Sequence, residues 1–461
     1  MKFTLSKLAS VLGLSGDAAG GDVVLSGVAV DSRRVQPGDL FVAFPGARAD
    51  GHDYAREAVA RGARAVLGMR RPEGLPPGLP VVVAPDTRGA LLAFAGAMKK
   101  EAGFRLAAIA GSVGKTTTKE FAAAILARRV AVEKTPGNQN SLIGFPLSVV
   151  NLPRVPEWMV GEMGMSALGE IARLSKTFSP DVAAITVIAA EHLEFLGSLD
   201  GVARANGEIL EGLKPEAIFV ANADDARVAA LAAGRSGRTL RFGRGAAADI
   251  TVHDVTPDAA GTRFFLRTPA GEAAIALSLP GLHQVSNFLA ASAVAIAAGA
   301  SLEDCAAAAP GLRPAAHRGE LRRHSSGALL YDDAYNASPP SMRAALETLK
   351  LVQGKRKIAV LGDMLELGPE DFWWHEEAGR YAVGRADRLI CVGPRARSIG
   401  EGAIEAGFPV AEVRYLSSAE EAANLLDSML TEGDAVLFKA SRAVGLERAV
   451  ELLAGAKAGK R

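Results

Sequence analysis

The sequence predicts an α/β protein of three domains. Its 461 residues correspond to about three domains at roughly 150 residues each. Hydrophobic residues make up 49% of the chain, which is enough for several buried cores. Short apolar segments alternate with segments of helical pattern, and this alternation is typical of parallel sheets covered by helices.

The first domain is expected at residues 1–85, as a small α/β unit. Residues 39–44 have the apolar character of a strand, and residues 54–62 have the pattern of an amphipathic helix. The Pro- and Gly-rich residues 71–80 predict a loop between its last strands.

The central domain is expected at residues 86–312, with a mostly parallel, doubly wound sheet. Its predicted strands include residues 106–110, 158–161 and 182–189, separated by helical stretches. Residues 239–279 contain successive short strands with little helix between them, which predicts a small antiparallel insertion.

A C-terminal Rossmann-like domain is expected at residues 313–461, where the alternation of strand and helix begins again. Its predicted strands, each followed by a helix, are residues 328–331, 357–361, 388–392 and 435–438. We expect Trp373 and Trp374 in a loop that packs on this domain.

The composition indicates a small-molecule partner. The 52 Lys and Arg residues nearly balance the 51 Asp and Glu residues, for a net charge of +1, which argues against the basic surface of a nucleic-acid binder. Cys305 and Cys391 stand in no disulfide or zinc pattern, which favours a reducing cytoplasm. The sequence contains neither a signal-peptide pattern nor an apolar stretch of spanning length, so we expect no membrane insertion.

The clearest local motif is Gly111-Ser-Val-Gly-Lys-Thr-Thr-Thr118, which follows an apolar strand and opens a predicted helix. Backbone N–H groups of such a loop surround phosphate oxygens, the lysine reaches the terminal phosphates, and a threonine hydroxyl binds Mg²⁺. Ile109 stands where the full motif has its first glycine. The motif still predicts a nucleotide site at Gly111, Ser112, Val113, Gly114, Lys115, Thr116 and Thr117.

Two further side chains are expected at the carboxyl ends of strands, where open α/β sheets bind ligands. Glu162 ends the strand at 158–161, and His192 follows the strand at 182–189. In isolation, Glu162 is more typical of a solvated loop carboxylate, and His192 is as typical of a structural histidine as of a ligand. With the phosphate loop they describe one cleft, in which Thr116, Glu162 and His192 are candidate metal ligands.

The whole chain resembles the Mur ligase family, the ATP-dependent enzymes that build the peptide stem of peptidoglycan. The motifs follow the family's order through all three domains. The matching segments are residues 30–43, 50–54, 111–118, 135–140, 144–146, 281–287, 331–339, 361–368 and 438–443, together with Arg318.

The resemblance implies roles for individual residues. For ATP it adds Asn138, His283, Asn287, Arg318, Asp333 and Asn336 to the phosphate loop. For the UDP-linked substrate and the incoming dipeptide it implies Asp31, Ser32, Arg33, Gly51, His52, Asp53, Asn140, Lys439, Ser441 and Arg442. The residues expected in catalysis, with ATP and Mg²⁺, are Lys115, Glu162, His192 and Arg318.

Residues 331–339, Tyr-Asp-Asp-Ala-Tyr-Asn-Ala-Ser-Pro, resemble the branch that adds D-alanyl-D-alanine to UDP-N-acetylmuramoyl-tripeptide. The branch that adds the third residue of the peptide is the runner-up, but its Asp-Asn-Pro-Arg segment does not occur here. The resemblance implies ligation through an acyl phosphate, by a cytoplasmic monomer, with the third residue of the tripeptide left open. A nucleotide-driven switch or motor and a non-catalytic nucleotide-binding relative are the alternatives from other classes.

Two positions depart from the family's pattern. Asn206 stands where the family usually has a carbamoylated lysine that bridges to a second Mg²⁺, and Gln284 stands where asparagine is common. A neutral amide is a weaker metal ligand than a carbamate, so Asn206 is expected to weaken the second metal site. Lys214, eight residues further on, would point about 80° away around a helix and is a poor substitute.

Overall fold

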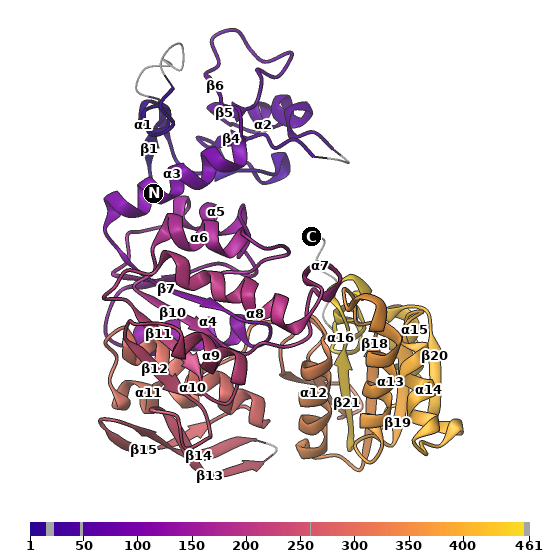
Figure 1. The fold of residues 1–461 in the computed structure, drawn as a ribbon. Helices are drawn as coiled ribbons and strands as arrows, with labels where there is room; N and C mark the ends of the chain where they lie inside the picture. The colour runs from indigo at the N-terminus through magenta and orange to yellow at the C-terminus, as the bar shows by residue number, and fades with distance from the viewer. Residues whose placement is uncertain (15–22, 47–48, 259, 456–461) are drawn as a thin grey trace.

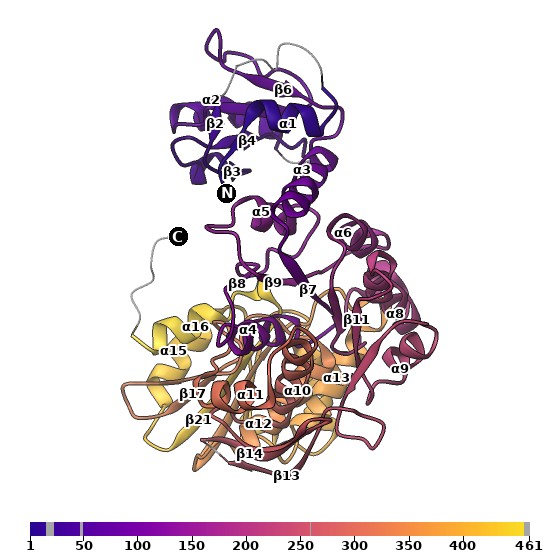
Figure 2. The ribbon, with the colours of Figure 1, turned by 90° about the vertical axis from the view of Figure 1, so that its left-hand side faces the viewer.

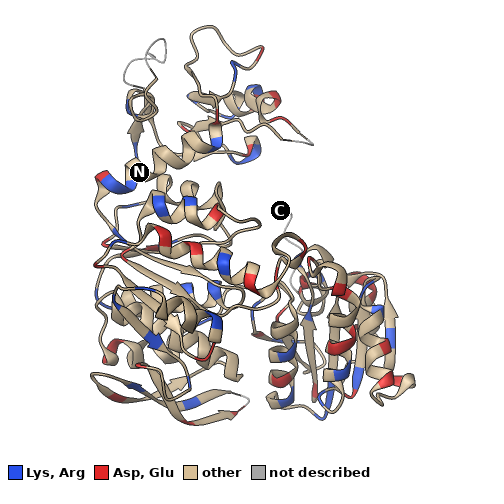
Figure 3. Cartoon of the chain, viewed as in Figure 1, with Lys and Arg blue, Asp and Glu red and all other residues tan. Residues whose placement is uncertain are grey.

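The computed structural model describes residues 1–461 except 15–22, 47–48, 259 and 456–461. It confirms the α/β class and shows three units in chain order, with the first above the central one and the third beside it (Figure 1; Figure 2). Acidic and basic residues are mixed over all three units (Figure 3). No helix among the described residues is long and apolar enough to span a membrane.

The first unit is built on a parallel sheet of four strands in the order β3-β4-β5-β6, beside the antiparallel pair β1 and β2. The predicted helix at 54–62 is found at residues 55–60, and residues 71–80 form a loop as predicted. The elements of this unit are β1 (Phe3–Thr4), α1 (Leu5–Val11), β2 (Val24–Leu25), β3 (Val28–Ala29), η1 (Ser32–Arg34), β4 (Leu40–Val42), η2 (Gly51–Tyr54), α2 (Ala55–Ala60), β5 (Ala65–Gly68) and β6 (Val81–Val83).

The central unit contains a parallel sheet in the order β12-β11-β10-β7-β9-β8. Its strands are β7 (Arg105–Ala110), β8 (Val132–Lys134), β9 (Trp158–Glu162), β10 (Val182–Ile185), β11 (Ile218–Asn222) and β12 (Thr239–Phe242). Its helices are α3 (Thr87–Ala102), α4 (Lys115–Leu126), α5 (Gly144–Val150), α6 (Glu170–Phe178), α7 (Leu193–Leu196), α8 (Leu199–Gly207), η3 (Glu208–Gly212), α9 (Ala226–Ala233), α10 (Leu282–Ala297), α11 (Leu302–Ala308) and η4 (Ala309–Gly311).

Both faces of this sheet are buried, which explains why its strands are apolar throughout. Leu106, Ala108 and Ala110 of β7 pack with helices α3, α5, α6 and α8 on one face. Ala107 and Ile109 pack with α4 and α10 on the other face. The alternation of side chains along the strand thus leaves only the strand ends free to form a site.

Two strand predictions for the central unit were wrong in part. β10 ends at Ile185 rather than at Ala189, because the following backbone bonds to the phosphate loop: Ser112 N–H donates to Val187 O over 2.7 Å. Residues 239–242 form β12, which pairs parallel to β11 and therefore belongs to the main sheet. The antiparallel insertion comprises β13 (Thr251–Asp258), β14 (Gly261–Thr268) and β15 (Gly271–Leu277).

The third unit has the predicted Rossmann-like arrangement of a parallel sheet between helices, with one antiparallel edge strand, β16. Helices α12, α13 and α14 cover one face, and α15 and α16 cover the other. Its elements are β16 (Glu320–Arg323), β17 (Leu329–Asp332), α12 (Pro339–Leu351), β18 (Arg356–Gly362), η5 (Gly368–Glu370), α13 (Asp371–Ala382), β19 (Arg388–Val392), α14 (Arg397–Glu405), η6 (Val410–Glu412), β20 (Val413–Leu416), α15 (Ala419–Met429), β21 (Asp434–Lys439), η7 (Arg442–Val444) and α16 (Glu447–Leu453).

Trp373 and Trp374 lie in the first turn of α13, so the prediction of a loop was wrong. The short 3₁₀ turn η5 ends at Glu370, and the helix begins at the next residue. The two rings form an edge-to-face pair with centroids 4.5 Å apart. Trp374 packs against the domain core, and Trp373 is 47% exposed.

Candidate active site

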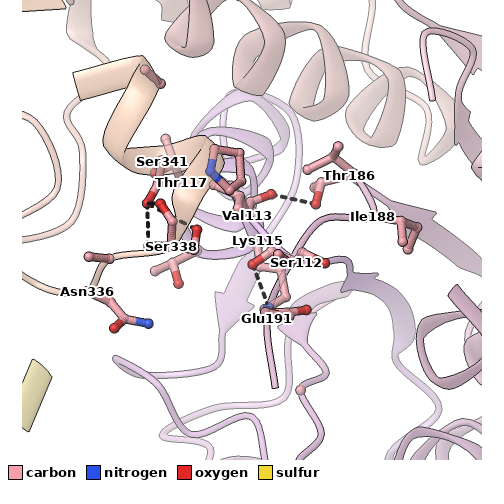
Figure 4. Close-up of a pocket in the computed structure, with 18 of the residues that line it drawn as sticks. Ser112, Val113, Lys115, Thr117, Thr186, Ile188, Glu191, Asn336, Ser338 and Ser341 are labelled. Carbon is pink, nitrogen blue, oxygen red and sulfur yellow. Dashed lines mark hydrogen bonds and ion pairs between the residues drawn. The ribbon is translucent and has the colours of Figure 1, made fainter. Parts of the chain in front are cut away.

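A cleft of about 1280 Å³ lies between the central and C-terminal units. The phosphate loop lines one side of it, and the opposite side includes Asn336 and Ser338, just before α12, and Ser341 in its first turn (Figure 4). All the residues predicted for ATP, catalysis and metal line this cleft, except Gly111. Asn140, Lys439, Ser441 and Arg442 line it as well.

Two hydrogen bonds hold the phosphate loop against the chain that follows β10. Thr186 Oγ1 donates to Val113 O over 2.7 Å (Figure 4), and Ser112 Oγ donates to Ala189 O over 3.1 Å. Gly111 has φ +123°, and a Cβ there would lie 2.1 Å from Thr186 Oγ1. The loop therefore needs glycine at this position, and its shape is set by the chain that follows β10.

Lys115 is the first residue of α4 and stands at the mouth of the loop. Its Nζ lies 2.5 Å from Gly111 O, 3.2 Å from Ser112 O and 3.4 Å from Glu191 Oε2. Glu191 was missed at the sequence level, although it immediately precedes the predicted ligand His192. An ammonium held by carbonyls and one carboxylate is available to exchange these partners for phosphate oxygens.

The candidate metal ligands Thr116 and Glu162 are in contact. Thr116 Oγ1 donates to Glu162 Oε2 over 2.7 Å, and Asn140 Nδ2 donates to Glu162 Oε1 over 2.8 Å. Glu162 is 3% exposed, and both of its oxygens are held by neutral donors. A buried carboxylate beside a hydroxyl is an oxygen-only donor set, which fits Mg²⁺.

The described contact of His192 is with the C-terminal unit rather than with this pair. His192 has φ +50°, and its Nδ1 is 2.5 Å from Oε2 of Glu366, a residue of the C-terminal unit that also has a positive φ, +64°. The described residues contain no group of three or more His, Cys, Asp or Glu side chains arranged to hold a metal. His192 thus joins the two units across the cleft in this structure.

The C-terminal wall carries four of the predicted charged residues. Lys439 is 2% exposed, and its Nζ donates to Asp333 Oδ2 over 2.6 Å. The other two, Arg318 and Arg442, both contact Tyr335, a residue that was not predicted from the sequence. The Arg318 guanidinium lies 3.9 Å from the centre of the Tyr335 ring, and Arg442 Nη1 donates to the Tyr335 hydroxyl over 2.9 Å.

His283, at the start of α10, lies where the two units meet. Its Nδ1 is 3.4 Å from Thr348 Oγ1 of α12. Burial among packed neighbours lowers the pKa of His283 from 6.5 to about 4. The imidazole is therefore neutral at physiological pH.

This pKa predicts a pH dependence of stability. Between about pH 6.5 and pH 4 the unfolded chain binds a proton at His283 that the folded chain does not bind, so folding stability falls as the pH falls through this range. We expect a His283→Asn variant to lose thermal stability less steeply than the wild type in this window. Melting temperatures measured at intervals from pH 4 to 7.5 test this, and parallel curves would contradict it.

Asn206 is buried in α8, behind the phosphate loop. Its Oδ1 accepts a hydrogen bond from Gly111 N–H over 2.7 Å, and its Nδ2 donates to Val202 O over 3.0 Å. The amide oxygen is thus engaged by the loop itself. Lys214 lies beyond the end of the helical segment, with its Nζ 3.9 Å from Asp181, so the expected helical geometry does not apply to it.

The Asn206 contact predicts a loss of nucleotide affinity on truncation. An Asn206→Ala variant leaves a buried N–H without an acceptor, at a cost of about 1–3 kcal/mol, and Asn206→Asp retains the acceptor. We expect calorimetric titration with ADP to show weaker binding for the alanine variant than for the aspartate variant. Equal ADP affinity in wild type and Asn206→Ala would contradict a role in shaping the loop.

The predicted residues of the first unit lie at a separate cavity of about 530 Å³. Asp31, Ser32, Arg33 and Gly51 line it, and His52 and Asp53 do not. His52 is buried instead: its Nδ1 is 2.5 Å from Asp50 Oδ1, and its Nε2 accepts from Met69 N–H over 2.9 Å. Its ring nitrogens therefore support the wall of the cavity rather than face a ligand.

Asp31 pairs with Arg33 on one side of this small cavity. Hydrogen bonds from the Arg33 guanidinium, at 2.9 and 2.7 Å, lower the pKa of Asp31 to about 2. Ser32 donates to Glu57 Oε2 over 2.8 Å. Glu57 and Tyr54 also line the cavity, and neither was predicted.

Three family models match successive parts of the chain. The Mur ligase middle domain matches residues 109–295, the glutamate ligase domain of Mur ligases matches residues 317–442, and the Mur ligase family catalytic domain matches residues 24–93. These matches agree with the order of the motifs in the sequence.

Curated relatives and solved structures agree with the family models. UDP-N-acetylmuramoyl-tripeptide--D-alanyl-D-alanine ligases are 37% identical in Bacillus subtilis, covering 93% of each chain, and 36% identical in Escherichia coli, covering 98% of each chain. MurF from Acinetobacter baumannii superposes with a TM-score of 0.88 at 29% identity, over 99% of each chain. MurF from Thermotoga maritima, in complex with ADP, gives 0.81 at 31% identity, over 93% of this chain and 97% of that one. The chain therefore belongs to the Mur ligase family.

Proposed function

We propose that this chain joins D-alanyl-D-alanine to the free carboxylate of UDP-N-acetylmuramoyl-tripeptide at the expense of ATP. The observation that carries the proposal is the single cleft in which the phosphate loop of the central unit faces Arg318, Asp333 and Lys439 of the C-terminal unit. The relatives that cover nearly the whole chain carry the name of this ligase. We further propose that the chain acts in the cytoplasm and as a monomer.

A carboxylate must be activated before an amine can attack it, because its oxygen is a poor leaving group. The substrate carboxylate attacks the γ-phosphorus of ATP, an oxygen–phosphorus bond forms, and ADP leaves. The amine of D-alanyl-D-alanine then adds to the acyl phosphate, and phosphate leaves as the amide forms and the amine loses a proton. Energetically, such phosphoryl transfer depends on positioning and electrostatic stabilisation.

The residues of the cleft suit these tasks. The loop N–H groups and Lys115 hold the transferred phosphoryl group, and Arg318 and Lys439 add positive charge from the opposite wall. Thr116 and Glu162 would hold Mg²⁺, which supplies charge neutralisation at the phosphates when bound. His192 and Glu366, in contact across the cleft, favour an arrangement that excludes water from the acyl phosphate.

We also propose that a second Mg²⁺ binds more weakly beside Asn206 than it would beside a carbamoylated lysine at this position. The Asn206 oxygen already accepts from Gly111 N–H, so a metal would have to compete with the loop. An Asn206→Lys variant is expected to reach half-maximal rate at lower Mg²⁺ and to respond to bicarbonate. A wild type that already binds Mg²⁺ as tightly as the variant would contradict this proposal.

The function is tested by following product and phosphate together. ATP, UDP-N-acetylmuramoyl-tripeptide and D-alanyl-D-alanine should yield one phosphate per UDP-linked pentapeptide, and omission of the dipeptide should stop steady turnover. A shorter UDP-linked dipeptide with a diamino acid as co-substrate provides the comparison with the runner-up activity. Turnover only with that pair would favour the runner-up, and ADP binding without turnover would favour a non-catalytic protein.

A further inference from the structure

Lys119 is a buried cation that the mechanism above does not use. It lies one helical turn after Lys115 in α4, and it is 0% exposed. Burial lowers the pKa of its ammonium group. A lysine is rarely placed in a core without partners, because removing its charge from water is costly. Its partners therefore indicate what it does.

The Lys119 ammonium holds a single backbone turn. Its Nζ donates to Thr135 O over 2.7 Å and to Gly137 O over 3.0 Å, and it lies 3.3 Å from Glu120 Oε1. Both carbonyl oxygens accept hydrogen bonds from the same ammonium group. An apolar side chain in place of Lys119 would leave both oxygens without this donor. The cation thus links the helix of the phosphate loop to the turn formed by residues 135–137.

This turn leads directly into the cleft. Asn138 and Asn140, which follow it, both line the cleft. Thr135 Oγ1 accepts from Glu162 N–H over 3.1 Å, and Asn140 Nδ2 donates to Glu162 Oε1. A shift of the turn would therefore move Asn140 relative to the Glu162 carboxylate.

The phosphate loop does not depend on the same contacts. It is fastened by Thr186 to Val113 O, by Ser112 to Ala189 O and by Asn206 to Gly111 N–H. Loss of the Lys119 ammonium is therefore expected to disturb the turn and leave the nucleotide cradle in place.

We propose that Lys119 is a positioning residue that sets the 135–140 segment, and through it Asn140, for the UDP-linked substrate. This inference rests on the proposed function and deepens it. In this view the buried Lys119 ammonium connects α4, the helix that follows the phosphate loop, to residues 135–140. These residues are proposed to contact the UDP-linked substrate.

The test compares Lys119→Met with Lys134→Met. Lys134 is a matched control, because it also pairs with Glu120 but is 46% exposed. For Lys119→Met we expect kcat/KM for the UDP-linked substrate to fall about 10- to 100-fold, the size of one or two lost hydrogen bonds from a charged donor. Its ADP affinity, measured by calorimetry, should fall much less than kcat/KM, because the contacts that hold the phosphate loop do not involve Lys119.

A double-mutant cycle with Asn140→Ala shows whether Lys119 acts through the segment. If it does, adding Lys119→Met to Asn140→Ala should cost much less than Lys119→Met costs alone. Lys119→Gln keeps an NH₂ donor group for the turn but loses the charge, so it should give an intermediate loss. It replaces Lys119→Met in the cycle if the methionine variant does not fold.

Three results would overturn the inference: full activity of Lys119→Met, parallel losses of ADP affinity and activity, or strict additivity with Asn140→Ala. The wild-type assay separates this failure from failure of the function. If the wild type is active and Lys119→Met is equally active, the role proposed for Lys119 is contradicted but the proposed function is not. If the wild type forms no ligation product, the proposed function is contradicted, and so is the role of Lys119 that depends on it.

Discussion

The Lys115→Met enzyme is expected to lose about 10²- to 10³-fold in kcat, the usual loss when one preorganised electrostatic contact to the transition state is removed. Lys115 Nζ now lies against Gly111 O, Ser112 O and Glu191 Oε2 at the mouth of the loop. Methionine has a similar length but cannot donate to phosphate oxygens. Steady-state phosphate release at saturating substrates measures the loss.

Lys176→Met is the control for Lys115→Met. Lys176 lies in α6, its side chain is 59% exposed, and its Nζ pairs with Glu211, so its substitution should leave kcat unchanged. Comparable kcat values for Lys115→Met and the wild type would contradict the assignment of the phosphate loop as the ATP site.

Glu162→Gln is expected to reduce kcat by a similar factor, about 10²-fold or more, and to raise the Mg²⁺ concentration needed for half-maximal rate. The substitution removes the charge and offers one oxygen where the carboxylate offers two. It also places an amide NH₂ against either the Thr116 hydroxyl or the Asn140 amide, both of which now donate to Glu162. Rates measured across a Mg²⁺ titration give both parameters.

Glu157→Gln is the matched control, because Glu157 immediately precedes the same strand, β9, and pairs with Arg105 on the surface. Its Mg²⁺ dependence should equal that of the wild type. If Glu162→Gln also kept the wild-type Mg²⁺ dependence, Glu162 would not be a metal ligand.

Much of the cleft could be predicted because its signals are local. The glycines, lysine and threonines of the phosphate loop stand in eight consecutive residues, and Glu162 ends an apolar strand. Local pattern also predicted the position of most strands. Where it failed, at residues 186–189, the apolar run continues while the backbone changes its hydrogen-bond partners from the sheet to the phosphate loop.

The rest depends on contacts between distant segments. Asn206 accepts from Gly111, 95 residues earlier in the chain, and Arg442 donates to Tyr335, 107 residues earlier. His52 has the composition of a ligand, but its two ring nitrogens contact Asp50 and Met69. No spacing in the sequence specifies such pairs, because tertiary packing selects them.

The most direct test follows oxygen from the substrate carboxylate. UDP-N-acetylmuramoyl-tripeptide labelled with ¹⁸O in its free carboxylate is incubated with ATP and D-alanyl-D-alanine, and the released phosphate is analysed by mass spectrometry. Attack of the carboxylate on ATP predicts one ¹⁸O atom in each phosphate released. Unlabelled phosphate, formed while ATP is consumed, would mean that water rather than the carboxylate receives the phosphoryl group, and it would contradict the ligase mechanism.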